Sequence, residues 1–138
     1  MTDAAASSGE VVDGEATPGE RFARALAVKD FEAIAALLHP EIDFKGMTPS
    51  RFWEAHSPDE VIHGVLQLWF EDSDHIDELL EVETGQVVRR DWVRYRVAVT
   101  NPEGRFEVEE QVYYRSADGV ITQMRAICSG YQPVDPDA

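Results

Sequence analysis

The carboxyl-terminal half of the chain alternates apolar and polar residues with a period of two, which is typical of β-strands in a sheet. The expected strands are His75–Thr84 or slightly beyond, Trp92–Thr100, and the two arms of a final hairpin over Arg105–Gly130. Asn101-Pro102-Glu103-Gly104 predicts the turn between the middle strands, and a short early strand is expected over Glu41–Phe44.

Helical spacing is confined to the amino-terminal half, where two capping boxes mark helix starts. Thr17-Pro18-Gly19-Glu20 opens a first helix that ends near Lys29, and Asp30 caps a short second helix. Ser57-Pro58-Asp59-Glu60 opens a third. Helices followed by long strands predict a single-domain α+β fold, in which a curved antiparallel sheet wraps round three amino-terminal helices.

The turn Ser116-Ala117-Asp118-Gly119 sets the predicted register of the last hairpin. Pairing Arg115 with Val120 places one set of side chains on the inner face of the sheet: Glu109, Gln111, Tyr113, Met124, Ala126 and Cys128. The other set then lies on the outer face: Val108, Glu110, Val112, Tyr114, Ile121, Arg125 and Ile127, with Glu110 opposite Arg125. A slip of one residue would exchange the faces of a strand.

Composition limits the classes of partner and the cellular compartments that we expect. The net charge of −15 repels polyphosphates and anionic lipid, so we expect no nucleic-acid and no membrane partner. The opening residues lack the pattern of a secretion signal, and no stretch approaches the roughly 20 apolar residues of a membrane span. Cys128 is the single cysteine and forms no intrachain disulfide, so we expect a cytoplasmic protein.

The chain divides into one domain and two short tails. Residues 1–17 are acidic and poor in large apolar side chains, which predicts a disordered tail. Residues 18–134 have the length of one ordinary domain, and residues 135–138 form a carboxyl-terminal tail.

Two segments, RFARALAVKDFEAIAALLHPEIDF and ADGVITQMRAICSGY, together with the order of the elements, resemble the nuclear transport factor 2-like superfamily. Ketosteroid isomerase and the SnoaL-type polyketide cyclases share this fold. The resemblance covers roughly Glu20 to Pro133 and implies a cystatin-like cone. It implies a fold more than a function, because the same cone hosts isomerases, dehydratases, epoxide hydrolases, cyclases and proteins without chemistry.

The resemblance implies catalytic positions that are mostly vacant here. The tyrosine on the first helix of ketosteroid isomerase falls on Phe22, and its general base falls on or next to Gly46. The protonated acid on the late strand falls on Gln111, while Asp43 lies near the base position but out of phase. Steroid-type enolisation is therefore not predicted.

The candidate site is the polar group on the predicted inner face, Glu109, Gln111 and Tyr113. Convergent polar side chains in an apolar pocket are typical of small-molecule sites. The alternative is that these side chains hydrogen-bond one another in a filled core. The expected pocket walls are Phe44, Trp53, His56, Trp69, Tyr95, Val97, Met124 and Cys128.

Two functions follow from this candidate site. In the first, a SnoaL-like pocket protein binds a small apolar ligand in the cone without catalysis. In the second, an isomerase, cyclase or dehydratase uses Glu109 as acid and base, with Gln111 and Tyr113 as hydrogen-bond donors. We expect no cofactor. We expect no metal either, because the histidines show no ligand spacing: His39, His56, His63 and His75.

The predicted outer face of the sheet is too apolar for a monomer in water. Its apolar members are Val108, Val112, Tyr114, Ile121 and Ile127. We therefore expect a homodimer that forms through this face.

Overall fold

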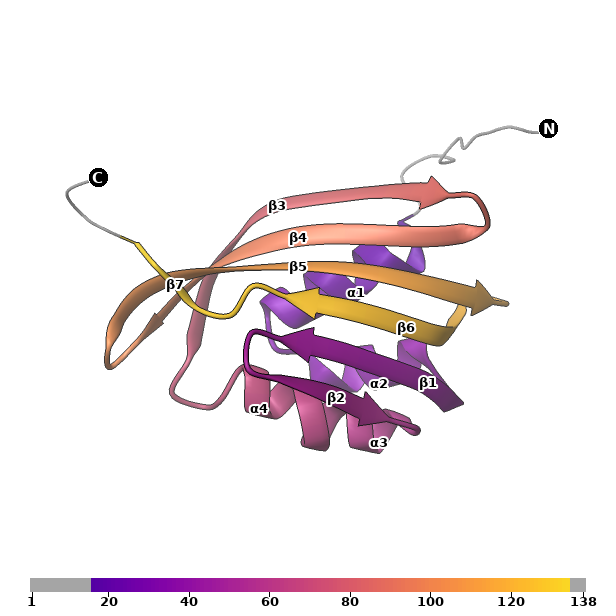
Figure 1. The fold of residues 1–138 in the computed structure, drawn as a ribbon, viewed down its shortest axis with the longest axis horizontal. Helices are drawn as coiled ribbons and strands as arrows, with labels where there is room; N and C mark the ends of the chain where they lie inside the picture. Colours follow the sequence, from indigo (N-terminus) through magenta and orange to yellow (C-terminus); the bar gives the residue numbers. More distant parts are fainter. Residues whose placement is uncertain (1–15, 135–138) are drawn as a thin grey trace.

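The computed structural model describes residues 16–134, which form three helical regions and one curved sheet (Figure 1). The helical regions are α1 (Pro18–Ala27), α2 (Phe31–Leu37), and a third made of α3 (Pro58–Val61), the π-helix η1 (Ile62–Leu66) and α4 (Gln67–Trp69). No helix among these residues is long and apolar enough to cross a membrane.

Seven strands form the sheet in the described part of the chain. They are β1 (Leu38–Thr48), β2 (Arg51–Ala55), β3 (His75–Val87), β4 (Arg90–Asn101), β5 (Gly104–Ala117), β6 (Val120–Cys128) and β7 (Gln132–Pro133). The order across the sheet is β2-β1-β6-β5-β4-β3, and β7 pairs with β5. The β1–β6 pair is parallel, and the other pairs are antiparallel.

All three predicted helix starts are confirmed by their caps. The hydroxyl of Thr17 accepts a hydrogen bond from the Glu20 amide at 3.1 Å, and that of Ser57 accepts one from the Glu60 amide at 3.1 Å. Asp30 caps α2 in the same way. Each cap satisfies a donor that the first helical turn leaves free, so local sequence alone is enough to fix these positions.

The first strand is longer than the sequence predicts. The sequence pattern also does not predict the second strand, β2. Gly46 suggested a loop, but it lies inside β1 and is buried. A Cβ atom at this position would come within 3.1 Å of the Trp69 ring, so glycine allows the indole to approach the strand. The chain reverses only at Pro49 and Ser50, and β2 then pairs with β1.

The predicted α+β cone is confirmed. The helices lie behind the sheet in Figure 1, and one apolar core fills the space between the two layers. The largest fully buried side chains include Phe22, Phe44, Tyr95 and Tyr114, which come from one helix and three strands. The sheet is open, because β2 and β3 form its two edges.

The predicted register of the β5–β6 hairpin is wrong. The turn contains two residues, Asp118 and Gly119, both with positive φ, and Ala117 pairs with Val120. A bulge at Thr122 then adds one residue to β6, because Ser116 pairs with Ile121 but Arg115 pairs with Gln123. The two-residue turn by itself would keep every side chain on its predicted face. The bulge shifts the pairing by one residue, so the side chains of β5 lie on the face opposite to the predicted one.

The consequences differ between the two strands of the hairpin. On β6, Met124, Ala126 and Cys128 are buried as predicted and Ile127 is exposed as predicted, whereas Ile121, before the bulge, is buried. On β5 the prediction is reversed. The side chains that it placed outside are buried: Val108, Glu110, Val112 and Tyr114.

Two further expectations change with the register. Arg125 does not pair with Glu110 but donates to the carboxylate of Asp43 on β1 at 3.0 Å. The apolar residues predicted for the dimer interface belong to the core, with the exception of Ile127. The predicted tails, residues 1–17 and 135–138, lie outside the described residues apart from Ala16 and Thr17.

Candidate functional site

A row of polar side chains crosses the inner face of the sheet, from the middle of β4 and β5 to the end of β6. Tyr95 pairs with Glu110, and Glu110 pairs with Cys128, so the three side chains are neighbours on adjacent strands. Their exposed fractions are 0%, 1% and 6%. The Tyr95 hydroxyl donates a hydrogen bond to Oε1 of Glu110. The row therefore places a carboxyl group, a phenol and a thiol together inside an apolar core.

Burial shifts the acid–base properties of all three groups. Loss of solvent raises the pKa of Glu110 to about 7, although the hydrogen bond from Tyr95 and the nearby Cys128 thiol act in the opposite direction. Burial, followed by the charge of Glu110, raises the pKa values of both Tyr95 and Cys128. Near neutral pH, Glu110 is therefore divided between its charged and neutral forms, while the phenol and the thiol keep their protons.

Two buried polar atoms near this row have no hydrogen-bond partner among the described residues. They are Oε2 of Glu110 and Nε1 of Trp69. The Trp69 ring packs beside Phe44 and over Gly46, and Gly46 pairs with Ala126, two residues before Cys128 on β6. An unpaired buried polar atom costs roughly 1–3 kcal/mol, so both positions would gain from a bound polar group.

The predicted site residues Glu109, Gln111 and Tyr113 lie on the outer face, because β5 is reversed relative to the prediction. The Glu109 carboxylate accepts a hydrogen bond from Arg94 at 2.9 Å, and its side chain is 44% exposed. The Gln111 amide donates to the Tyr113 hydroxyl at 3.1 Å. The orientation predicted for these three side chains is therefore wrong.

Most of the predicted pocket walls come together inside the cone. Six of the eight belong to the buried core: Phe44, Trp69, Tyr95, Val97, Met124 and Cys128. Trp53 is half-buried and meets Trp69 edge to face, with ring centroids 6.0 Å apart. His56 is exposed in the loop before α3, and its amide donates to Glu60 at 2.7 Å. His56 therefore lies at a helix cap and not at a cavity wall.

The catalytic positions of ketosteroid isomerase have partial counterparts in this interior. Phe22 is buried beside Tyr95, with ring centroids 6.4 Å apart, so a phenol does reach the interior, but from β4 and not from α1. The inward acid of β5 is Glu110 and not residue 111.

The sequence contains a pattern that predicts a buried side chain at Glu110. The register drawn from the turn predicted the opposite face of β5. Val108, Val112 and Tyr114 recur at even positions of β5, and this apolar alternation marks the buried face of a strand. Glu110 is the one charged member of that face. A charged residue within an apolar alternation is an exception to ordinary core composition, and such exceptions are candidates for functional residues.

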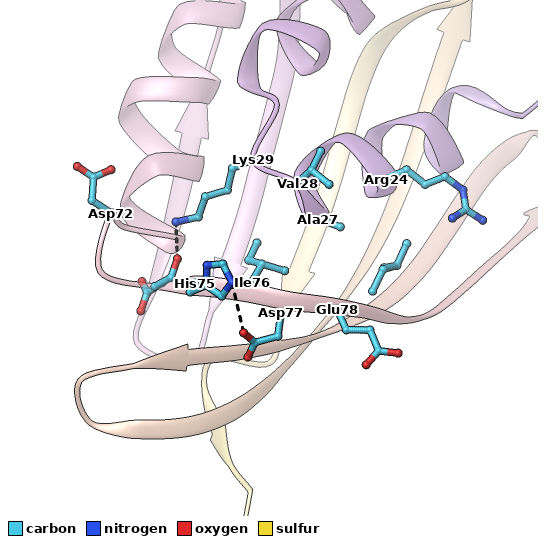
Figure 2. Close-up of a pocket in the computed structure, with 11 residues that line it drawn as sticks. Arg24, Ala27, Val28, Lys29, Asp72, His75, Ile76, Asp77 and Glu78 are labelled. Atoms are coloured by element: carbon cyan, nitrogen blue, oxygen red, sulfur yellow. Dashed lines mark hydrogen bonds and ion pairs between the residues drawn. The ribbon is translucent and has the colours of Figure 1, made fainter.

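A groove of about 840 Å³ lies elsewhere, between the end of α1 and the start of β3 (Figure 2). Lys29 donates to the main-chain carbonyls of Glu71 and Asp74, and His75 lies 3.5 Å from Asp77. The buried Asp74 carboxylate accepts hydrogen bonds from the Glu71 amide and from Asn101. Because its polar groups bond to one another, this groove is a weaker candidate than the interior row.

No protein-family model and no curated protein sequence matches the chain. Solved structures do match it. The LEH-like epoxide hydrolase of M. tuberculosis aligns with a TM-score of 0.59 at 15% identity, over 81% of this chain and 80% of the other. A protein of Bacillus subtilis with the provisional name isomerase aligns with a TM-score of 0.68 at 9% identity, over 81% and 84% of the two chains.

A third structure carries the name of the predicted superfamily. The nuclear transport factor 2-like protein of Burkholderia thailandensis aligns with a TM-score of 0.61 at 19% identity, over 83% of this chain and 92% of the other. The chain therefore has the nuclear transport factor 2-like, SnoaL-like fold, as the sequence predicted. At these identities the likeness establishes the fold alone.

Proposed function

We propose that the protein binds a small, largely apolar molecule inside the cone and that the Glu110 carboxyl group is its polar anchor. The observation that carries this proposal is a fully buried carboxyl group with one oxygen bonded to Tyr95 and the other without a hydrogen bond among the described residues. A ligand hydroxyl or carbonyl group at Oε2 would complete the hydrogen bonding of the site, while the surrounding core side chains would contact the apolar body of the ligand.

The ligand must displace a core side chain, because the side chains around Glu110 fill the interior. Trp69 is the best candidate for this movement. It is the last residue of α4, the short helix that follows the π-helix η1, and π-helical turns often lie at functional sites. Its indole N–H has no acceptor among the described residues, so an outward rotation breaks no side-chain hydrogen bond of Trp69.

A titration with 2-naphthol, monitored by tryptophan fluorescence, tests the proposal. The probe combines an apolar bicyclic body with one hydroxyl group. Glu110→Gln keeps an acceptor for Tyr95 but removes the carboxyl group, and it should weaken binding at least about tenfold, which corresponds to roughly 1.4 kcal/mol. Glu109→Gln is the matched control on the opposite face and should change binding less than about twofold, because it alters only a partly exposed pair on the outer face.

The pH dependence of binding gives a second readout at the same site. If the probe contacts Glu110, its affinity should change across the titration of that group, whose pKa lies at about 7. The Glu110→Gln variant should show a flat profile between pH 6 and 8. Equal binding by the parent protein and both variants would overturn the proposal.

A second candidate function is acid–base catalysis of the isomerase, cyclase or dehydratase type. The observation that favours it is the pKa of Glu110 at about 7, since a general acid or base works best when its pKa lies near the pH of operation. In this version Glu110 takes the role that the sequence predicts for Glu109. Tyr95 holds the carboxyl group in place and keeps its own proton.

Exchange of the α-protons of 2-tetralone in deuterated buffer, measured by NMR, tests this second function. A catalyst that moves protons at a carbon beside a carbonyl should accelerate the exchange above the buffer rate, and Glu110→Gln should abolish the acceleration. Glu109→Gln should leave the rate unchanged. Binding of 2-naphthol without accelerated exchange would favour the non-catalytic function.

A further inference from the structure

An apolar groove of about 520 Å³ lies between α2 and the third helical region. Phe31 and Ala35 are four residues apart on α2, and Pro58 and Ile62 are four residues apart on the opposite wall. Residues at this spacing share one face of a helix. Ile62 is only 5% exposed and closes the floor, whereas the other three side chains are partly exposed. The groove therefore presents an apolar surface that solvent reaches from outside.

The form of the groove suits a helix. Each wall is the face of one helical region, and two neighbouring helices leave a furrow into which the side chains of a third helix can pack. The wall of the third helical region runs from Pro58 to Gln67, which is about 13 Å at the rise of a helix, or two to three turns. An amphipathic helix that lays its apolar face into a groove is a common mode of protein recognition.

The rim of the groove is acidic. The four helical segments that form it, α2, α3, η1 and α4, contain three carboxylates and no lysine or arginine. Two of these carboxylates, Glu32 and Asp59, lie on opposite walls and are exposed. Within residues 16–134, the one ion pair of either group joins Asp59 to His63 at 3.4 Å. The rim therefore favours an occupant that carries positive charge.

We propose that this groove binds an amphipathic helix of a basic partner protein. The apolar side chains of that helix fill the floor, and lysine or arginine side chains beside them pair with Glu32 and Asp59. A second copy of the chain does not fit this rim, because its net charge of −15 would bring like charges together. The proposal does not depend on the ligand proposed for the inside of the cone.

A fluorescein-labelled synthetic peptide tests the proposal by fluorescence anisotropy with the full chain in 150 mM salt. The peptide has 15 residues of leucine and lysine, with leucine at helical spacing on one face. It should bind in the micromolar range. A peptide of the same composition in scrambled order has the same charge but no apolar face, and it should bind at least about tenfold more weakly.

Two neighbouring alanines of α2 give a matched pair of variants. Ala35 lines the groove, whereas Ala36 is exposed and does not line it. Ala35→Lys places bulk and a repelling charge on the floor and should weaken peptide binding at least about tenfold. Ala36→Lys adds the same side chain outside the groove and should weaken binding less than about threefold. Circular dichroism establishes that each variant is folded.

The acidic rim is tested by removing charge from exposed positions, where folding is not at risk. Glu32→Gln combined with Asp59→Asn should weaken binding at least about threefold, since exposed ion pairs contribute up to about 1 kcal/mol each. Glu103→Gln combined with Asp118→Asn is the control, because both residues are exposed and lie in turns of the sheet. It should change binding less than about twofold.

Three results would overturn the proposal. The first is a parent protein that does not bind the helical peptide up to about 100 μM. The second is equal binding of the helical and the scrambled peptide, which would show attraction by net charge alone. The third is an equal loss of binding from the two charge-removing variants, or from Ala35→Lys and Ala36→Lys, which would place the contact outside the groove.

Discussion

Glu109 and Glu110 are consecutive residues of one strand, yet they occupy opposite environments. Glu109 is half-exposed and belongs to an ionic network with Arg94, which also binds Glu81 and Glu83. Glu110 is fully buried, and within residues 16–134 its side chain accepts one hydrogen bond, from the Tyr95 phenol. A glutamate side chain is thus an ion-paired surface group at position 109, whereas at position 110 it is a buried group that is largely protonated below neutral pH.

The difference shows that exposure to solvent affects the acid–base properties of a carboxyl group on this sheet more than the neighbouring residues in the sequence do. On the outer face, Arg94 is partly exposed and hydrogen-bonds three carboxylates, and these bonds raise the pKa of its guanidinium group. On the inner face, burial outweighs the favourable hydrogen bond and raises the pKa of Glu110. Four changes to the two faces test this contrast.

The largest effect is expected for Glu110→Ala. The change leaves a cavity in the core and removes the acceptor of the Tyr95 hydroxyl, and it should lower the free energy of unfolding by about 4 kcal/mol. Urea denaturation at pH 5, where Glu110 is protonated in the folded protein, measures it. Glu109→Ala is the control and should cost far less. Equal losses from the two changes would contradict the assignment of faces.

The pH dependence of stability should show the next effect. The pKa of Glu110 rises from 4.5 to about 7 on folding, so the folded state holds this proton more tightly than the unfolded state. The resulting contribution is fully present below pH 4.5 and is lost as pH rises through 7. The parent protein should therefore lose up to about 3 kcal/mol relative to Glu110→Gln between pH 4.5 and 8. Parallel profiles in urea denaturation would show that Glu110 does not titrate in this range.

A smaller effect is expected for Tyr95→Phe. The change removes one buried hydrogen bond and should cost about 1 kcal/mol at pH 5. Because the Tyr95 hydrogen bond lowers the pKa of Glu110, its loss should move the midpoint of the pH-dependent loss of stability to higher pH. A pH series of urea denaturation curves measures both quantities. A midpoint that stays in place or moves to lower pH would argue against the bond.

The smallest effect is expected on the outer face, for Arg94→Met. The change keeps an unbranched side chain and removes the charge that joins three carboxylates. The destabilisation should fall below that of Tyr95→Phe and should diminish in 1 M NaCl, since salt screens exposed charges. The effect of Glu110→Ala should be the same at both salt concentrations. A loss from Arg94→Met that does not respond to salt would indicate that the network is not screened by solvent.

The sequence by itself determined the features that rest on short-range chemistry. The caps Thr17, Asp30 and Ser57 placed the helix starts, because each side chain bonds an amide three residues away. The turn at Asn101–Gly104 and the alternation in β4 followed from local preferences in the same way. The sequence also predicted six residues of the buried interior, because they are large or apolar side chains on the expected buried faces of strands and a helix. They are Phe44, Trp69, Tyr95, Val97, Met124 and Cys128.

The tertiary structure decided between two conflicting signals on β5: the apolar alternation favours Glu110 as the inward acid, whereas the register drawn from the turn favours Glu109. The register depends on the length of the turn and on the bulge at Thr122, and a bulge has no strong sequence signal, because it forms where the strand pairing and the core packing favour it together. Gly46 is a similar case. A glycine favours a loop by local preference, but here it continues a strand, because the Trp69 ring from a distant helix needs the space. Both decisions depend on packing against other elements of the fold, so local preferences at Thr122 and Gly46 do not specify them.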